Sequence, residues 1–169
     1  NVNAFESLMN PYMKILYNYI LSNVSNTEDV KDIFQETMLA IWQGLKSFNR
    51  NSSFKTWIIG IAKYKVADFY RKSYKNSSLQ TIYNENIANI HESNDYISDV
   101  VNRVDLGNSM ESLPKKDREL LFLVFSAQLT YKEIEKITGI PEGTIKSRIY
   151  YLKDKLRPLL KERGVWDGW

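Results

Sequence analysis

The sequence predicts an all-α protein of two small helical domains joined by a flexible linker. Apolar residues recur at steps of three and four over most of the chain, which is the period of a helix with one buried face. Glycine and proline are scarce, and no stretch alternates apolar and polar residues as a half-buried strand would. Residues 75–108, rich in Asn, Ser, Asp and Glu, form the expected linker between domains at residues 1–74 and 109–169.

Composition narrows the kinds of site that the chain can hold. It has no Cys and a single His, His91, in the expected linker. Disulfides and thiolate metal sites are excluded, little remains for a zinc site, and we expect no metal and no cofactor. No apolar run reaches the roughly 18 residues of a membrane-spanning helix, and we find no signal-peptide pattern. We therefore expect a soluble, cytoplasmic protein.

The net charge of +3 is unevenly distributed. Residues 1–72 carry nine basic and six acidic groups, residues 73–112 carry two and six, and residues 113–163 carry twelve and seven. Two basic blocks around an acidic connector are typical of two polyanion-binding modules on one tether. Chance unevenness of solvated surfaces is the alternative.

The first expected helix covers residues 4–23. Its apolar positions fall on one face, and we interpret them all as core: Phe5, Leu8, Met9, Tyr12, Ile15, Leu16, Tyr19 and Ile20. Pro11 lies within this pattern, and its missing N–H can split or kink the helix.

The second expected helix begins at a cap, Asn26 or Thr27, and extends to about residue 47. One side of it carries polar groups with a leucine beside them: Asp32, Gln35, Glu36 and Leu39. Paired carboxylates can do acid–base chemistry, but no nucleophile or partner base accompanies them. The face is either solvated or a protein-docking surface, and the pattern does not separate these two readings.

A loop over residues 48–53 and a helix over residues 54–73 complete the first domain, with Ser53 as the expected cap. One arc of the helix interleaves cations with aromatic rings: Thr56, Lys63, Tyr64, Ala67, Tyr70 and Arg71. Such an arc suits single-stranded nucleic acid, because cations meet phosphates and rings stack on bases. An amphipathic helix with partly buried tyrosines explains the pattern equally well.

The second domain should contain helices over residues 96–112 and from Pro114 onward, followed by a helix–turn–helix over residues 131–156. Gly139 suits the end of the first helix of this motif, and Pro141 suits the start of the second, which Pro158 should end or kink. The second helix buries Ile145, Ile149, Leu152 and Leu156 and leaves Thr144, Lys146, Ser147, Arg148 and Tyr151 towards solvent. This layout favours insertion into a DNA major groove, and a plain helical hairpin is the alternative.

Two blocks together resemble the extracytoplasmic-function (ECF) sigma factors of bacterial RNA polymerase. EDVKDIFQETMLAIW with LKSFNRNSSFKTWIIGIAKYKVADFYRK is similar to the promoter-melting domain of the family. LPKKDRELLFLVF with LTYKEIEKITGIPEGTIKSRIYYLKDKL is similar to its C-terminal helix–turn–helix domain. GIPEGTIKSRI follows the family's GIP-x-GT-[VI]-KSR-[LI] closely. The resemblance spans nearly the whole chain in the right order.

The resemblance implies three sets of binding residues. The residues that would dock on the clamp helices of core RNA polymerase are Asp32, Gln35, Glu36, Leu39 and Trp42. The residues that would bind the −10 strand are Phe48, Arg50, Asn51, Ser52, Ser53, Phe54, Lys63, Tyr64, Ala67 and Arg71. The residues that would bind the −35 duplex are Glu142, Thr144, Lys146, Ser147, Arg148 and Tyr151.

The resemblance thus implies a non-enzymatic transcription initiation factor. Its partners would be core polymerase (clamp helices and flap), promoter DNA and an anti-sigma factor, often membrane-linked, with no small-molecule substrate. A stand-alone helix–turn–helix regulator is the alternative; the polar face around Glu36 separates the two, since a plain repressor does not need it. Three residues depart from the family pattern: Tyr64, often Asn; Glu135, usually Ala and expected to require outward rotation or some opening; and Tyr151, in a stretch that is often Arg-rich.

Overall fold

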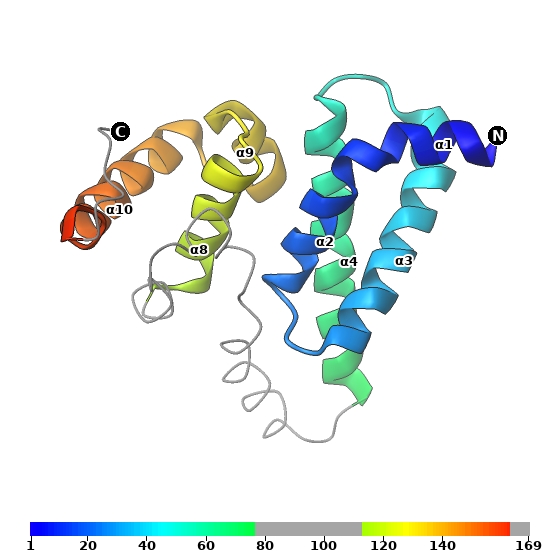
Figure 1. Cartoon of the computed structure of the whole chain (residues 1–169), viewed down its shortest axis with the longest axis horizontal. Helices are drawn as coiled ribbons and strands as arrows, with labels where there is room; N and C mark the ends of the chain where they lie inside the picture. The colour runs from blue at the N-terminus through cyan, green and yellow to red at the C-terminus, as the bar shows by residue number, and fades with distance from the viewer. Residues whose placement is uncertain (77–112, 163–169) are drawn as a thin grey trace. The chain divides into compact units, whose positions relative to one another are not determined.

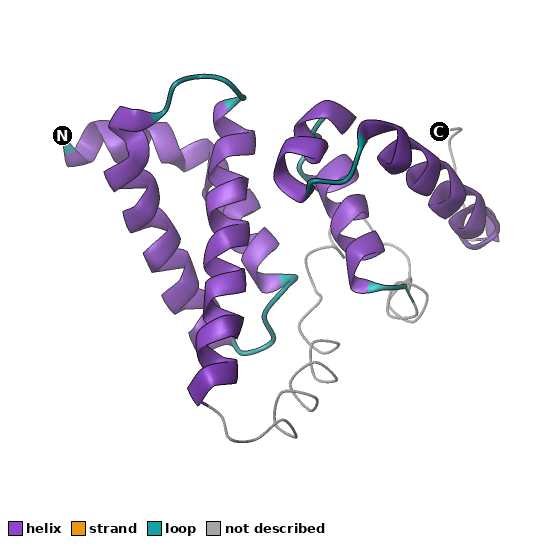
Figure 2. Cartoon of the chain, turned by 180° about the vertical axis from the view of Figure 1, so that it is seen from behind, coloured by secondary structure: helices purple, strands orange, loops and turns teal. Residues whose placement is uncertain are grey.

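The computed structural model describes residues 1–76 and 113–162, and this part of the chain contains helices and no strand (Figures 1 and 2). The predicted all-α class is confirmed. The chain divides into two compact units, Asn1–Asn94 and Asp95–Trp169, and each is considered by itself as the N-terminal and the C-terminal unit. His91, most of the expected linker, the expected helix over residues 96–112 and the tail lie outside the described residues.

The N-terminal unit begins with two helices separated by a short break. Helix α1 (Val2–Met9) leads through a 3-10 turn, η1 (Asn10–Tyr12), into α2 (Met13–Leu21). The break holds Pro11, whose missing N–H cannot continue the α-helical ladder. The predicted split at Pro11 is confirmed, but Leu8 is 40% exposed and is not in the core. The 3-10 turn interrupts the helical period, so the buried face of α2 does not continue along α1.

Helix α3 (Thr27–Gly44) starts at the predicted cap. The Asn26 side chain accepts hydrogen bonds from the backbone N–H groups of Glu28 and Asp29, at 2.8 and 3.3 Å. Buried Thr37 donates its hydroxyl proton to the Ile33 carbonyl at 2.7 Å, so this polar side chain is satisfied within its own helix. A 3-10 turn, η2 (Leu45–Ser47), follows.

Helix α4 (Phe54–Asn76) packs against both α2 and α3, as the ribbons in Figure 1 show. The fully buried side chains at this junction are Leu16, Ile20, Ile41, Ile58, Ile59 and Ala62. The helix begins where the sequence predicts, because the Ser53 hydroxyl accepts from the Thr56 N–H at 3.2 Å. It extends three residues beyond the predicted end at residue 73.

The C-terminal unit contains α8 (Lys115–Leu121), a π-helical turn η4 (Phe122–Ser126), α9 (Tyr131–Thr138) and α10 (Glu142–Glu162). Its core is made of Leu120, Leu123, Ile134, Ile145, Ile149 and Leu152. Pro114 directly precedes α8, as predicted. Pro158 does not end α10; it is exposed, so water can satisfy the carbonyl group that loses its N–H partner.

Neither described range holds a helix long and apolar enough to cross a lipid bilayer. Over the same ranges, no group of three or more His, Cys, Asp or Glu side chains is placed to hold a metal ion.

Candidate nucleic-acid interface

The helix–turn–helix predicted from the sequence is present, and its turn is closed by local hydrogen bonds. Thr130 and Glu133 form a capping box at the start of α9. The Thr130 hydroxyl accepts from the Glu133 N–H at 3.2 Å, and the Glu133 carboxylate accepts from the Thr130 N–H at 2.8 Å. Gly139 ends α9 at φ 74°, a conformation that suits glycine, and its N–H donates to the Glu135 carbonyl at 2.8 Å. Helix α10 starts three residues later.

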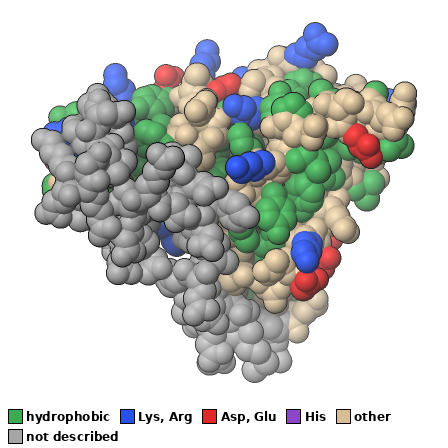
Figure 3. Space-filling view, in the orientation of Figure 1, with side chains coloured by type: hydrophobic (Ala, Val, Ile, Leu, Met, Phe, Trp, Pro, Cys, Tyr) green, Lys and Arg blue, Asp and Glu red, His purple; other side chains and the backbone are tan. Residues whose placement is uncertain are grey.

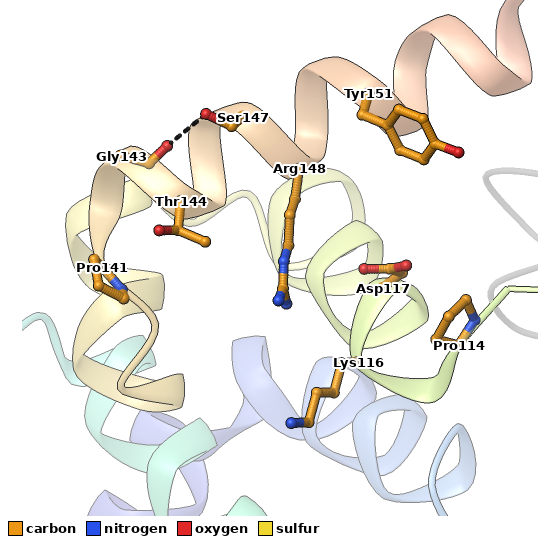
Figure 4. A pocket seen from close by; sticks show the side chains of 9 residues that line it. All are labelled: Pro114, Lys116, Asp117, Pro141, Gly143, Thr144, Ser147, Arg148 and Tyr151. Atoms are coloured by element: carbon orange, nitrogen blue, oxygen red, sulfur yellow. Dashed lines mark hydrogen bonds between the residues drawn. The ribbon is translucent and has the colours of Figure 1, made fainter.

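Helix α10 has the two faces that the sequence predicts. Ile145, Ile149, Leu152 and Leu156 are buried, whereas Glu142, Thr144, Lys146, Ser147, Arg148 and Tyr151 are exposed. The Ser147 hydroxyl donates to the Gly143 carbonyl at 3.0 Å (Figure 4). In this rotamer Ser147 offers a DNA partner an acceptor and no donor, which suits a base amino group better than a phosphate.

A groove of about 720 Å³ lies between the start of α8 and the exposed face of α10. Its lining residues are Pro114, Lys116, Asp117, Pro141, Gly143, Thr144, Ser147, Arg148 and Tyr151. Figure 4 shows the side chains of Arg148 and Lys116 extending into the same opening from different helices. Lys146 and Glu142, expected in the same set as Arg148, do not line it.

Lys116 is a candidate that sequence reasoning missed. It is exposed in the first turn of α8 and shares the groove with Arg148. In the sequence, Pro114 indicates only the start of a helix, and the two lysines that follow it carry no local signal of a binding role. Their position beside α10 depends on how α8 and α10 pack, and that packing is not visible in a local pattern.

The loop over residues 48–53 rests on an aromatic cluster. The Phe48 ring lies 4.8 Å from the Trp57 ring and 5.7 Å from the Phe54 ring, and Phe54 lies 5.3 Å from Tyr12, all measured between centroids. These four side chains are half-buried. The cluster therefore supports the loop from beneath, and exposed Arg50 and Asn51 are left as its outward side chains, whereas the Ser53 hydroxyl caps α4.

The backbone of this loop is bent sharply at Arg50, which has φ 60°. The Asn49 side chain accepts a hydrogen bond from the Asn51 N–H at 3.1 Å and so closes a turn around Arg50. Ser52 is half-buried, and its hydroxyl lies 3.3 Å from the Ser53 carbonyl.

The expected nucleic-acid arc of α4 is only partly exposed. Tyr64 is 58% exposed, Ala67 and Arg71 are exposed, and Lys63 is half-exposed. Thr56 is buried beside the Ser53 cap, and the Tyr70 hydroxyl donates to the Asn23 carbonyl. Thr56 and Tyr70 therefore do not belong to an exposed nucleic-acid arc, because both side chains reach groups outside the regular part of α4, and for Tyr70 the alternative of a partly buried tyrosine is confirmed.

Two cations of α4 are held by one carboxylate. Asp68 forms ion pairs with Lys72 at 3.1 Å and with Arg71 at 3.7 Å. The hydrogen bond from Lys72 lowers the pKa of the Asp68 carboxyl, and the same bond raises the pKa of Lys72. Arg71 therefore faces solvent with part of its charge already compensated.

The side chains of the polar face of α3 are exposed to solvent. Asp32, Gln35 and Glu36 are exposed, and Leu39 among them is 56% exposed. Burial raises the pKa of the Asp29 carboxyl at the start of the same helix, and the charges of Asp32 and Glu28 add to the rise. The start of α3 therefore carries three neighbouring carboxyl groups, and its middle carries an exposed apolar residue.

An apolar groove of about 660 Å³ continues this face at the end of α3. It lies between α1 and α3 and is lined by Asn1, Ala4, Phe5, Leu8, Trp42, Gln43, Leu45 and Lys46. The rings of Phe5 and Trp42 meet edge to face at 5.0 Å. Figure 3 shows hydrophobic side chains gathered over much of the visible face of the N-terminal unit.

Comparisons with known proteins find similarity along most of the chain. Two family descriptions match, Sigma-70 region 2 over residues 5–75 and Sigma-70, region 4 over residues 103–156. The ECF RNA polymerase sigma factor SigW of Bacillus subtilis is 27% identical, over 94% of this chain and 90% of SigW. SigM of the same organism is 27% identical, over 97% of this chain and 99% of SigM. A solved structure of the sigma factor RpoE with the anti-sigma factor NepR from Bartonella quintana shares the fold, with a TM-score of 0.63, 20% identity and coverage of 94% of this chain and 97% of that one.

Proposed function

The chain belongs to the ECF-type sigma factors of the sigma-70 family, and on that premise we propose how its two units share the work. A sigma factor binds core RNA polymerase, directs it to promoters and helps to open the −10 region. The observation that carries the division of labour is the order of the two matched regions, region 2 and then region 4, on two separate units. Catalysis belongs to the polymerase, and we assign no catalytic step to this chain.

The proposed polymerase-docking surface is the exposed face of α3, formed by Asp32, Gln35, Glu36, Leu39 and Trp42. Two observations support this assignment. Exposed Leu39 and Trp42 lie on the same helix as the acidic residues, and an apolar centre with a polar rim is the usual composition of a binding surface. The groove beside Trp42 enlarges the apolar area that a helical partner would cover.

The proposed −10 surface combines the loop over residues 48–54 with α4. A base extruded from the duplex needs a pocket with an aromatic wall and hydrogen-bonding edges. Phe48 and Phe54, held by Trp57, can supply the wall, and Arg50, Asn51, Ser52 and Ser53 can supply the polar groups. Lys63, Tyr64, Ala67 and Arg71 would then line the path of the separated strand, where cations meet phosphates and Tyr64 stacks on a base.

The proposed −35 surface is the exposed face of α10. Helix α10 would enter the major groove, with Arg148 and Lys146 placed to donate to guanine edges or phosphates. Glu142, Thr144, Ser147 and Tyr151 complete the surface. We add Lys116, since its ammonium group shares the groove with Arg148 and suits a phosphate of the same duplex.

We also propose that an anti-sigma factor regulates this chain in the cytoplasm. The support is the likeness to RpoE of Bartonella quintana, which was solved in complex with the anti-sigma factor NepR. Exposed Leu39 and the apolar groove beside Trp42 would give such a regulator a surface to cover.

Reconstituted transcription tests the proposed function. The purified chain and core polymerase are given a library of promoter fragments, and run-off transcripts are sequenced. We expect transcripts that start at specific promoters and that core polymerase alone does not make. Absence of such transcripts over the whole library would overturn the proposal.

Paired variants test the division of labour. The double variant Lys146→Ala/Arg148→Ala should weaken −35 duplex binding at least about tenfold, while polymerase binding persists. The double variant Leu39→Ala/Trp42→Ala should weaken polymerase binding, while −35 duplex binding persists. Lys14→Ala/Lys132→Ala removes two exposed cations outside both surfaces and is the charge-matched control. Equal loss of both activities in either double variant would show that the surfaces are wrongly assigned.

A further inference from the structure

The proposed recognition helix starts without a cap of its own. The Pro141 carbonyl accepts from the Ile145 N–H at 3.0 Å, which puts Pro141 at the N-cap position of α10. The proline ring has no oxygen that could accept an N–H of the first turn. The first N–H groups of a helix lack partners within the helix, so this end of α10 needs a cap from elsewhere.

Glu135 of the preceding helix supplies that cap. Its carboxylate accepts the N–H of Glu142, the first residue of α10, at 3.0 Å. Its backbone carbonyl accepts the N–H of Gly139 at 2.8 Å, and between these bonds the Thr138 hydroxyl accepts from Ile140 at 3.2 Å. One residue therefore closes the turn at both ends. The side chain is exposed, in agreement with the outward rotation expected from the sequence.

We propose that Glu135 is a positioning residue that fixes the angle at which α10 meets DNA. The proposal rests on the assignment of α10 to −35 recognition. A carboxylate at the positive end of the helix dipole stabilises the first turn, which contains Thr144 and lies directly before Lys146. The same negative charge repels phosphates, so a purely electrostatic role would oppose DNA binding, whereas a positioning role favours sequence-specific binding. The two roles have opposite effects on sequence-specific DNA binding, so an experiment can separate them.

Three substitutions at this position separate geometry from charge. Glu135→Ala removes the acceptor and the charge. Glu135→Gln keeps an acceptor at the same reach and removes the charge. Glu135→Asp keeps the charge and shortens the side chain by one methylene, so the bond to Glu142 is lost. Asp154→Asn, on the exposed side of α10 and away from the turn, removes one charge together with its 3.5 Å ion pair to Arg157, and is the control for loss of a carboxylate elsewhere on the same helix.

The full chain is measured in complex with core polymerase. Its affinity is determined for a promoter found by run-off and for the same fragment with a scrambled −35 element. The readout is the ratio of the first affinity to the second. Loss of a helix cap changes an equilibrium constant by about fivefold, so we expect the affinity ratio to fall about fivefold in Glu135→Ala and Glu135→Asp. It should stay within about twofold of the unsubstituted ratio in Glu135→Gln and Asp154→Asn.

The pattern across variants decides the outcome. An unchanged or raised ratio in Glu135→Asp, or a fall in Glu135→Gln as large as that in Glu135→Asp, would overturn the positioning role. If Glu135→Ala does not fold, the comparison of Glu135→Asp with Glu135→Gln still decides, because both keep a polar side chain there. A failure of the proposed function looks different: the unsubstituted chain would then show no preference for the promoter over the scrambled fragment.

Discussion

At the scale of single residues, the loop that should meet the −10 strand is held in an unfavourable backbone conformation. Arg50 has φ 60°, in the left-handed region where a side chain costs about 1–2 kcal/mol. Asn49 closes the turn around it with a side-chain hydrogen bond. Such outliers gather at functional sites, and a cation at the tip of a strained turn is consistent with a role in holding DNA.

Arg50→Gly should separate stability from function. Glycine adopts this conformation without strain but loses more backbone freedom on folding, so we expect a net gain of about 0.5–1 kcal/mol in the free energy of unfolding. Urea unfolding followed by Trp fluorescence measures this gain. Promoter opening, followed by a fluorescent base in the −10 element, should become weaker because the cation is lost. Opening at the unsubstituted level would show that Arg50 does not touch the strand.

At the scale of elements, an acidic side chain of α4 reduces the attraction that two cations of the same helix can exert on phosphates. Asp68 pairs with Lys72 and Arg71 one turn further along. The resemblance implies Arg71 as a contact of the −10 strand, and its pairing with Asp68 was not expected from the sequence. The pairing means that the proposed strand-binding side of α4 is less positive than its lysines and arginines alone imply.

Asp68→Asn should therefore strengthen binding of single-stranded DNA and steepen its salt dependence, since both cations become available to phosphates. The pKa of Asp68 is lowered from its ordinary value of 3.8, so the pairing is complete above that value and is lost only as pH falls through the lowered pKa. The difference between the two proteins should accordingly be constant from about pH 5 to pH 9. Fluorescence anisotropy with a short oligonucleotide measures both effects, and weaker binding in the variant would contradict this account.

At the scale of the whole molecule, each of the two grooves is assembled from segments that are distant in sequence. The groove of the C-terminal unit joins the first turn of α8 to α10, and the groove of the N-terminal unit joins α1 to the end of α3. Lys116 and Arg148 extend into one opening although α9 lies between them in the chain (Figure 4). Affinity for DNA should then depend on both helices of the first groove.

Lys116→Ala should weaken −35 duplex binding for every sequence alike and reduce the slope of log affinity against log salt by about 0.9, the value for one phosphate contact. Lys132→Ala, which removes an exposed lysine of α9 outside the groove, should leave the slope unchanged. Titrations at several salt concentrations make the comparison. An equal change in both variants would mean that Lys116 contributes only to net charge.

For the described residues, the sequence by itself determined most of the helices, the break at Pro11, the caps at Asn26 and Ser53, and the two faces of α10 with Gly139 at the turn. These features depend on side chains within about four residues of one another, so their signals survive in a linear pattern. The docking, −10 and −35 residue sets came from family resemblance and stay proposals, although their exposure on α3, α4 and α10 is consistent with them.

Only the tertiary structure decided what lies between elements. In the structure Leu8 is exposed, Thr56 is buried and the Tyr70 hydroxyl donates to a backbone carbonyl of another segment. The loop over residues 48–53 packs on Trp57, and Lys116 lines the same groove as Arg148. The Glu135 carboxylate accepts a hydrogen bond from the Glu142 N–H. Each of these outcomes depends on the rotation of one helix against another and on the reach of a side chain across a turn. The helical period specifies which face of a helix is apolar, but it does not specify which neighbour that face or its rim will meet.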